Sequence, residues 1–247
     1  MKINFGIKTG LNEAFIIDKE KRSELLKKCP KADEIIRPII RGRDVKKFKV
    51  KFAEKWLINS HNGTAREERI DLESDYPEIY KELLKKESEL RNRYDKGQHW
   101  SNLRNCAYLD EFEKPKIIWI ELSDEPKFAL DKAGYFVEAT AFFMTGPNLE
   151  YLVTFLNSKV ADWYFDKITT TSGVGTNRWK KVYIENLPIP VPNGEEMARF
   201  KEISEILTGE TSKDNEVIEC RSLMDNLIFE LCNLTDEEIA IISSFRR

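Results

Sequence analysis

Apolar residues along the chain recur either with the two-residue period of a strand or with the period of a helix. Both patterns occur up to about residue 193, and the helical pattern alone continues beyond it. Apolar runs predict strands over 5–9, 14–18, 48–59, 116–122, 128–130, 135–144 and 182–184. The first two strands are expected to form a hairpin, because Thr9-Gly-Leu-Asn12 between them is a turn sequence. Apolar residues at helical spacing predict helices over 23–29, 78–94, 149–167, 195–207 and 216–232, and a capping box over 235–238 predicts a last short helix.

The character of the chain changes near Asn193. The segment Leu187–Pro192 precedes this change and is expected to be stiff and extended, because each proline fixes its own φ and restricts the preceding residue. We therefore predict an α+β fold. It has a mixed β-sheet body with packed helices over 1–193 and a C-terminal helical tail over 194–247.

The amino-acid composition indicates the class of protein to which the chain belongs. The 247 residues are 41% hydrophobic and 34% charged, which is typical of a globular protein with its own core. No apolar run reaches the roughly 20 residues that span a bilayer, and the N-terminus has no signal-peptide pattern, so we expect a cytoplasmic location. The four cysteines are scattered and, with the two histidines, lack zinc-ligand spacing, so we expect free thiols and no metal in this chain.

Charge is distributed unevenly, although the net charge is only −3. Nine basic residues face four acidic ones between Lys31 and Lys55, and four basic residues face none between Lys167 and Lys181. Residues 195–238, by contrast, are rich in Glu and Asp. This asymmetry predicts one basic face and an acidic end that is directed elsewhere.

Basic and amide side chains on glycine-containing turns are the candidates for nucleic-acid contact. Ile36–Phe48 sets arginines and lysines around a glycine turn between apolar anchors, and residues 169–181 combine glycines with Asn, Arg and Lys. The rigid donor pair of arginine suits phosphates and guanine edges, and asparagine can pair with adenine. The candidate DNA contacts are Lys8, Thr9, Asn12, Arg41, Arg43, Lys46, Lys47, Arg104, Asn177, Arg178, Lys180 and Lys181.

A purely structural interpretation stays open for each of these segments. Asp44 can pair with one of the arginines and brace a solvated turn. The residues 8–12 can form a plain hairpin turn, and 169–181 can be a linker that places Trp179 in the core.

Catalytic patterns in the sequence are weak. Glu125-Pro-Lys127, with Asp110 or Asp124 upstream, mimics the carboxylate and lysine set of metal-dependent nucleases, but a proline between two predicted strands indicates a turn. The two histidines have no neighbours that mark a general base. We therefore expect no catalytic activity from this chain alone.

Seven segments, in the same order, resemble the TaqI-like C-terminal specificity domain. That domain is the target-recognition part of single-chain (type IIG) restriction-modification enzymes and of related DNA adenine methyltransferases. The segments that carry the resemblance are 6–18, 36–45, 114–119, 128–131, 151–159 (with Leu156-Asn-Ser-Lys159), 183–190 (with Asn186-Leu-Pro-Ile-Pro190), and 227–231 followed by 234–238.

The resemblance implies sequence-specific binding of double-stranded DNA beside an adenine methyltransferase or nuclease that performs the chemistry. The Asn/Asp-Pro-Pro-aromatic tetrapeptide that holds the flipped adenine in such methyltransferases does not occur here. The chain is therefore expected to be a fragment or separate subunit of a type II restriction-modification enzyme. S-adenosylmethionine and Mg²⁺ are expected in the catalytic domains rather than in this chain. The alternative function is a scaffold that joins methyltransferase and nuclease parts without reading bases.

Overall fold

Ten strands form three sheets in the computed structural model, which describes residues 1–64, 67–169, 177–209 and 213–245. The central sheet has the order β1-β9-β5-β7 with antiparallel neighbours, the second has the order β2-β4-β3-β8, and β10 pairs with β6. The strands are β1 (Lys2–Phe5), β2 (Ile16–Asp18), β3 (Ile36–Ile40), β4 (Lys55–Ile58), β5 (Lys116–Ile120), β6 (Leu122–Ser123), β7 (Phe128–Asp131), β8 (Phe136–Val137), β9 (Ala141–Thr145) and β10 (Asn177–Arg178).

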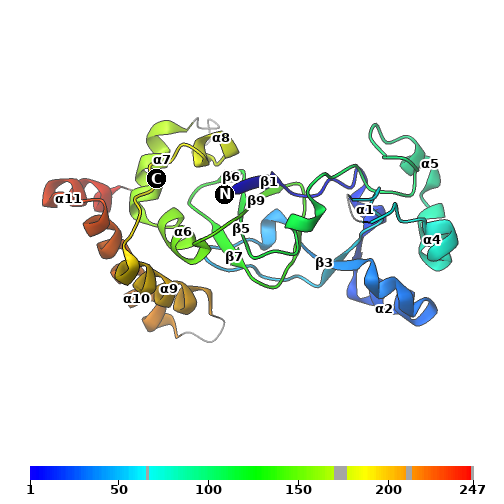
Figure 1. The fold of residues 1–247 in the computed structure, drawn as a ribbon, viewed down its shortest axis with the longest axis horizontal. Helices are drawn as coiled ribbons and strands as arrows, with labels where there is room; N and C mark the ends of the chain where they lie inside the picture. Colours follow the sequence, from blue (N-terminus) through cyan, green and yellow to red (C-terminus); the bar gives the residue numbers. More distant parts are fainter. Residues whose placement is uncertain (65–66, 170–176, 210–212, 246–247) are drawn as a thin grey trace.

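Helices lie at the two ends of the molecule, with the central sheet between them (Figure 1). One group is α1 (Asn12–Phe15), α2 (Lys19–Lys28), α3 (Leu72–Asp75), α4 (Pro77–Leu84) and α5 (Glu87–Arg91). The other is α6 (Leu149–Leu156), α7 (Lys159–Ile168), α8 (Lys181–Ile184), α9 (Gly194–Thr208), α10 (Asp214–Leu231) and α11 (Asp236–Ser244). Three short 3-10 turns are η1 (Pro30–Glu34), η2 (Gly42–Asp44) and η3 (Leu109–Glu111). This confirms the predicted α+β fold. No helix in the described part of the chain has the length and apolar character needed to cross a bilayer.

The central sheet is buried on both faces and separates two hydrophobic cores. Successive residues of β5 alternate between them: Ile117 and Trp119 belong to the core beneath α6 and α9, whereas Ile118 belongs to the core toward α1 and α4. In β9, Phe143 and Met144 divide in the same way. This alternation follows from the two-residue period of a strand. The sheet is therefore a rigid platform from which the turns at its edges project.

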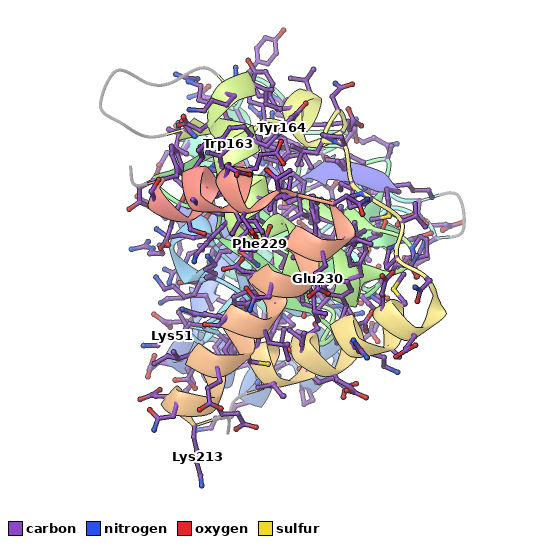
Figure 2. All side chains as sticks on the ribbon, turned by 90° about the vertical axis from the view of Figure 1, so that its left-hand side faces the viewer. Lys51, Trp163, Tyr164, Lys213, Phe229 and Glu230 are labelled. Atoms are coloured by element: carbon purple, nitrogen blue, oxygen red, sulfur yellow. The ribbon has the colours of Figure 1, made fainter. Side chains whose placement is uncertain are left out.

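The C-terminal helices pack on the core side of α6 and α7. Phe200 of α9 and Met224 of α10 are buried in the same core as Trp119. Figure 2 shows this end of the molecule, with Trp163 and Tyr164 of α7 near the end of α10 that carries Phe229. The tail thus shares its core with the sheet, and the division of the chain into two domains near Asn193 stays a prediction.

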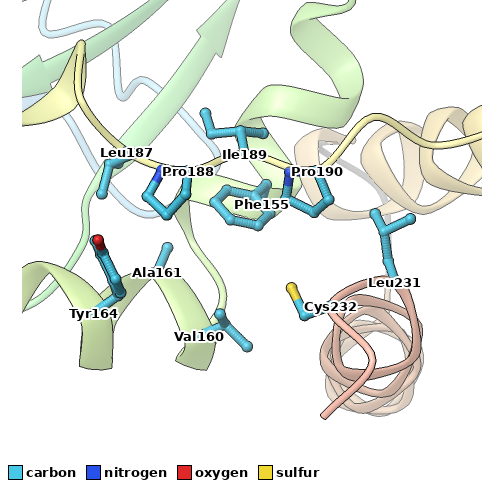
Figure 3. Close-up of a pocket in the computed structure, with 10 residues that line it drawn as sticks. All are labelled: Phe155, Val160, Ala161, Tyr164, Leu187, Pro188, Ile189, Pro190, Leu231 and Cys232. Carbon is cyan, nitrogen blue, oxygen red and sulfur yellow. The ribbon is translucent and has the colours of Figure 1, made fainter.

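The proline-rich segment between α8 and α9 has neither helix nor strand structure, as its sequence predicts. Pro188 and Pro190 line an apolar pocket of about 450 Å³ together with Phe155, Tyr164 and Cys232 (Figure 3). The Tyr151 hydroxyl donates to the Pro190 carbonyl at 2.7 Å. The stiff segment is therefore fastened over α6 and α7, and it leads the chain from the sheet to the tail.

The predicted N-terminal hairpin is wrong. The strand β1 ends at Phe5 and pairs with β9, whereas β2 begins at Ile16 and pairs with β4 of the second sheet. The turn sequence between them does turn the chain, with Gly10 at φ 76°, but the helical turn α1 follows it. The two strands therefore enter different sheets, and residues 8–12 form an open turn between them.

Other predicted elements also differ from the structure, and three of them are helical in it. The expected strand over 182–184 is the helical turn α8, because the Ile184 amide donates to the Lys180 carbonyl. The single helix expected over 149–167 is divided into α6 and α7, because the Ser158 side chain accepts from the Ala161 amide and begins a new helix. The helix expected over 78–94 is likewise divided into α4 and α5. The capping box at Thr235 is confirmed.

Candidate nucleic-acid interface

Arg41 and Arg43 have different surroundings on the turn that follows β3. The Arg41 guanidinium donates through Nε to Asp44 Oδ2 at 2.9 Å and through Nη2 to Oδ1 at 3.0 Å, and these hydrogen bonds raise the pKa of Arg41. Asp44 is buried, and its Oδ2 also accepts from the Arg41 amide. Arg43 is exposed, and its guanidinium has no partner among the described residues. Arg41 therefore braces the turn, and Arg43 is the arginine that is available to a ligand.

The turn of residues 8–12 is held by its own polar side chains. Thr9 is buried, and its hydroxyl donates to Asn12 Oδ1 at 2.6 Å. Asn12 Nδ2 in turn donates to Glu138 Oε1 at 2.6 Å. Lys8 is exposed, with Nζ 5.1 Å from the centre of the Phe5 ring. Unlike the expectation from sequence, Thr9 and Asn12 serve the turn itself, and Lys8 is the side chain that faces solvent.

The segment before β9 connects these two turns. Thr140 Oγ1 donates to Glu138 Oε2 at 3.3 Å and accepts from the Gly42 amide at 3.0 Å. Asn12 is bonded to the other oxygen of the same carboxylate. The turn of residues 8–12 and the turn of Arg41–Asp44 are therefore fixed to one short segment, although they are far apart in the sequence.

The segment that begins at β10 lies against Glu121, whose neighbour Ile120 packs against the Arg41 turn. The Trp179 amide donates to the Glu121 carbonyl at 2.7 Å, and Arg178 Nη1 lies 3.8 Å from Glu121 Oε1. The neighbouring Ile120 packs against the Arg41 turn, since a Cβ atom on Gly42 would lie 3.1 Å from Ile120 Cγ2. In Figure 1, α8, which follows Arg178, lies to the left of β1, and α1, which follows the turn of residues 8–12, lies to its right.

The other candidate residues near β10 differ in burial and in hydrogen-bond partners. Asn177 is buried, with Nδ2 3.5 Å from Asp166 Oδ1, so its side chain does not reach the surface as expected. Lys181 is exposed and donates to the Ile3 carbonyl at 3.1 Å. Lys180 is half-buried, and its side chain has no partner among the described residues. Residues 170–176 of the predicted loop lie outside the described residues, and Trp179 is in the core.

Lys46 and Lys47 are adjacent in sequence but lie in different environments. Lys46 is exposed, and its Nζ donates to the Arg43 carbonyl at 3.0 Å. Lys47 instead lines a pocket of about 330 Å³ with Asp162, Arg221 and Asp225 on α7 and α10. Burial in this pocket lowers the pKa of Lys47 and raises the pKa of Asp225. Lys47 therefore lies in a pocket that it shares with the helical tail, and its expected DNA contact stays a prediction.

Arg104 lies beside the turn of residues 8–12. A Cβ atom on Gly10 would lie 3.4 Å from Arg104 Nε and 2.8 Å from Arg93 Cδ. Burial of the Arg93 guanidinium, with the nearby Arg104 charge, lowers the pKa of Arg93 to about 10, which still leaves it a cation at neutral pH. This corner of the site thus holds two positive charges.

The side chains that bring the turns together were not identified from sequence. Glu121, Glu138 and Thr140 bond partners from 57 to 126 positions away, and no local pattern marks them. After these assignments, seven basic residues stay at least partly accessible. We call them the site cations, and they are Lys8, Arg43, Lys46, Arg104, Arg178, Lys180 and Lys181.

The site cations are only partly neutralised. Within the described parts of the chain, their carboxylate partners are Glu121, at 3.8 Å from Arg178, and Glu185, at 3.5 Å from Lys181. Guanidinium and ammonium groups in this setting are hydrogen-bond donors for phosphates and base edges. The chemistry that the arrangement supports is therefore anion binding and donor-based recognition.

The nuclease-like residues lie in a turn, as their proline indicates. Asp124–Lys127 connect β6 to β7, and Lys127 Nζ lies 2.7 Å from Asp124 Oδ1 and 3.7 Å from Glu125 Oε1. The lysine thus pairs with the carboxylates next to it in the sequence, which is the geometry of a closed surface turn.

Comparison with known proteins gives matches that cover this region. The sequence model of the TaqI-like C-terminal specificity domain matches residues 37–189. The type II methyltransferase M.MjaIV of Methanocaldococcus jannaschii is 23% identical over an alignment of 242 positions, which covers 94% of this chain and 79% of that protein. The fold is similar to part of the type IIL restriction-modification enzyme MmeI, solved in complex with DNA, with a TM-score of 0.68 and 10% identity. That similarity covers 99% of this chain, which spans 36% of the MmeI chain.

Proposed function

Because the chain belongs to the TaqI-like C-terminal specificity domain family, we propose that it recognises a double-stranded DNA target for a restriction-modification enzyme of the type IIG kind. The observation that supports the proposal is that the turns carrying Lys8 and Arg43 are bonded to one short segment, Glu138–Thr140, while Arg178 lies beside Glu121, next to the Ile120 side chain that packs on the Arg43 turn. These cations come from distant parts of the sequence, and most of them have no carboxylate partner in the described chain.

Five of the site cations divide into two roles in this proposal. Lys8, Lys180 and Lys181 are lysines, which suit phosphate contacts because an ammonium group is a compact charge without directional pairing. Arg43 and Arg178 carry the fork of donors that can pair with the O6 and N7 atoms of guanine. Among the described residues, the ion-pair partner of Arg178 is Glu121 at 3.8 Å, a long contact with which a duplex can compete. Phosphate contacts position the domain, and the two arginines read bases.

Catalysis in this proposal belongs to a partner. The relatives that the chain matches are named as a methyltransferase and a restriction-modification enzyme. We propose that an adjacent adenine methyltransferase binds S-adenosylmethionine and flips the target base, and that a nuclease part uses Mg²⁺. This chain supplies the docking surface and the base readout, and it contributes no catalytic residue.

Selection of bound sequences from a random duplex pool tests the function. We expect one sequence to be enriched and to bind at least about 100-fold more tightly than its scrambled version, with an affinity that falls steeply with salt. A fluorescence-anisotropy titration at several salt concentrations measures both quantities. Equal affinity for the two duplexes would favour the scaffold function, and no binding at any salt concentration would refute the recognition of DNA by this chain.

A further inference from the structure

Arg93 is a buried guanidinium that has no carboxylate partner in the described part of the chain. Its Nε donates to the Leu90 carbonyl at 3.2 Å, and its Nη1 donates to the Thr9 carbonyl at 2.6 Å. Its Nη2 donates to the carbonyls of Trp100 and Asn102 at 2.5 and 2.8 Å. These neutral acceptors satisfy the hydrogen-bonding groups but leave the positive charge uncompensated. Among the described residues, no carboxylate lies within ion-pair distance of Arg93, and Asp95 acts on it only from farther away.

Arg104 adds a second uncompensated charge at the same place. Its Nε is buried, and in the described part of the chain it has neither a hydrogen-bond partner nor an ion pair. The charge of Arg104 acts directly on Arg93, and the side chains of both residues lie against Gly10. Two like charges at close range repel each other, more strongly where protein excludes water. A pair of this kind without an acid is an arrangement that a bound anion stabilises.

Arg104 is half-buried, and Gly10, against which its side chain lies, is accessible to solvent. Gly10 is exposed and has no side chain to cover the two guanidinium groups, and Lys8 is exposed two residues before it. Arg41 provides the contrast within the same chain, because the Asp44 carboxylate already occupies its donor fork. Arg41 is thus neutralised within the protein, whereas Arg93 and Arg104 have no ion-pair partner in the described part of the chain.

We propose that Arg104, with the field of Arg93 and with Lys8 beside it, forms a phosphate site at Gly10 that takes one backbone phosphate of the bound duplex. This inference rests on the proposed function, since the turn that carries Gly10 is fixed through Glu138 to the Arg41 turn of the same interface. A free phosphate ion offers the same chemistry, and the experiment below separates the two sources. Arg104 contacts the phosphate, and Arg93 is a positioning residue that holds the turn and supplies charge.

The variant Arg104→Gln tests the site through the salt dependence of duplex binding. Loss of one phosphate contact is expected to lower the slope of log affinity against log salt by about 0.9. The ratio of affinities for the selected and scrambled duplexes is expected to stay unchanged, because a phosphate contact carries no sequence information. Arg104→Lys is expected to keep most of the slope. The control Arg199→Gln removes an exposed arginine on α9 that pairs with Glu195, and it is expected to leave the slope unaltered.

A second experiment compares the Tm in inorganic phosphate with the Tm in chloride at equal ionic strength. We expect phosphate to raise the Tm of the wild-type chain and not that of Arg104→Gln, and we expect Arg104→Gln to melt no lower than wild type in chloride, because repulsion of Arg93 is relieved. If the slope is unaltered but phosphate stabilises only wild type, the site takes a free phosphate and the DNA source is refuted. If neither protein binds a duplex, the proposed function fails and the melting arm alone decides whether the anion site exists. If the wild-type chain and Arg104→Gln have equal slopes and equal changes of Tm in phosphate, the inference is overturned and the proposed function is unaffected.

Discussion

Replacement of Arg43 and Arg178 together by alanine is expected to weaken binding of the selected duplex by about 30-fold to 1,000-fold. An arginine that pairs with a guanine contributes about 1–3 kcal/mol of discrimination, and about 1–2 kcal/mol for each of these two gives a loss of roughly 2–4 kcal/mol in the double variant. The affinity for scrambled duplexes is expected to fall much less. The ratio of the two affinities, measured by anisotropy at one fixed salt concentration, therefore reports the loss of base readout.

The same double variant is expected to keep its folded stability. Within the described ranges, Arg43 is exposed with no side-chain partner, and the guanidinium of Arg178 has one ion-pair partner, Glu121 at 3.8 Å. Such surface interactions contribute less than about 1 kcal/mol. Arg41→Ala is the matched control on the same turn, because it leaves the buried Asp44 carboxylate without its donor pair and is expected to cost about 1–3 kcal/mol. A double variant that melts as low as Arg41→Ala would assign Arg43 and Arg178 to structure.

Replacement of Lys116 by alanine is expected to destabilise the fold by about 3–5 kcal/mol, because it leaves a buried carboxylate unpaired. The Lys116 ammonium group is fully buried and lies 2.5 Å from Asp131 Oδ2, across the pair of strands β5 and β7. Burial lowers the pKa of Lys116, and the Asp131 charge opposes this shift. Asp131 also accepts from the amides of Ala133 and Tyr135, so it is held in place when its partner is removed.

Lys132→Ala is the control for the buried pair. Lys132 Nζ lies 2.7 Å from Glu150 Oε1, but the lysine side chain is 53% exposed, so its loss is expected to cost less than about 1 kcal/mol. Chemical denaturation measures both values. For a chain of this size, Lys116→Ala corresponds to a fall in Tm of roughly 6–20 °C. Losses of equal, small size for both variants would show that the Lys116–Asp131 pair does not support the central sheet.

The sequence was most informative where a structure depends on neighbouring residues. Pro77 begins α4, the capping box at Thr235 begins α11, and the prolines before Asn193 keep their segment extended, because caps and proline restrictions act within a few residues. The N-terminal hairpin was wrong because strand pairing is a long-range choice. The residues of β1 are compatible with many partners, and β9 lies more than 130 positions away.

The sequence identified the segments that carry the candidate site, but it did not identify the direction of each side chain. The turns at Lys8–Asn12 and Arg41–Lys47 and the chain from Asn177 to Lys181 were identified by composition, and the structure places their backbones around one region. The direction of individual side chains depends on distant partners. Lys47 turns toward Asp225 on a helix more than 160 positions later, and Glu138 holds Asn12 from 126 positions away. Neither pairing leaves a periodic or local pattern in the sequence.

The central claim is that cations from separate segments form one surface that contacts a DNA duplex, and photo-cross-linking tests it most directly. A photoreactive residue is placed singly at Lys8, Lys46 or Lys180, and at two exposed controls, Lys132 on the connection after β7 and Lys213 at the start of α10 (Figure 2). We predict cross-links to the selected duplex at all three site positions and at neither control. Cross-links confined to the control positions, or to one site position alone, would contradict the claim.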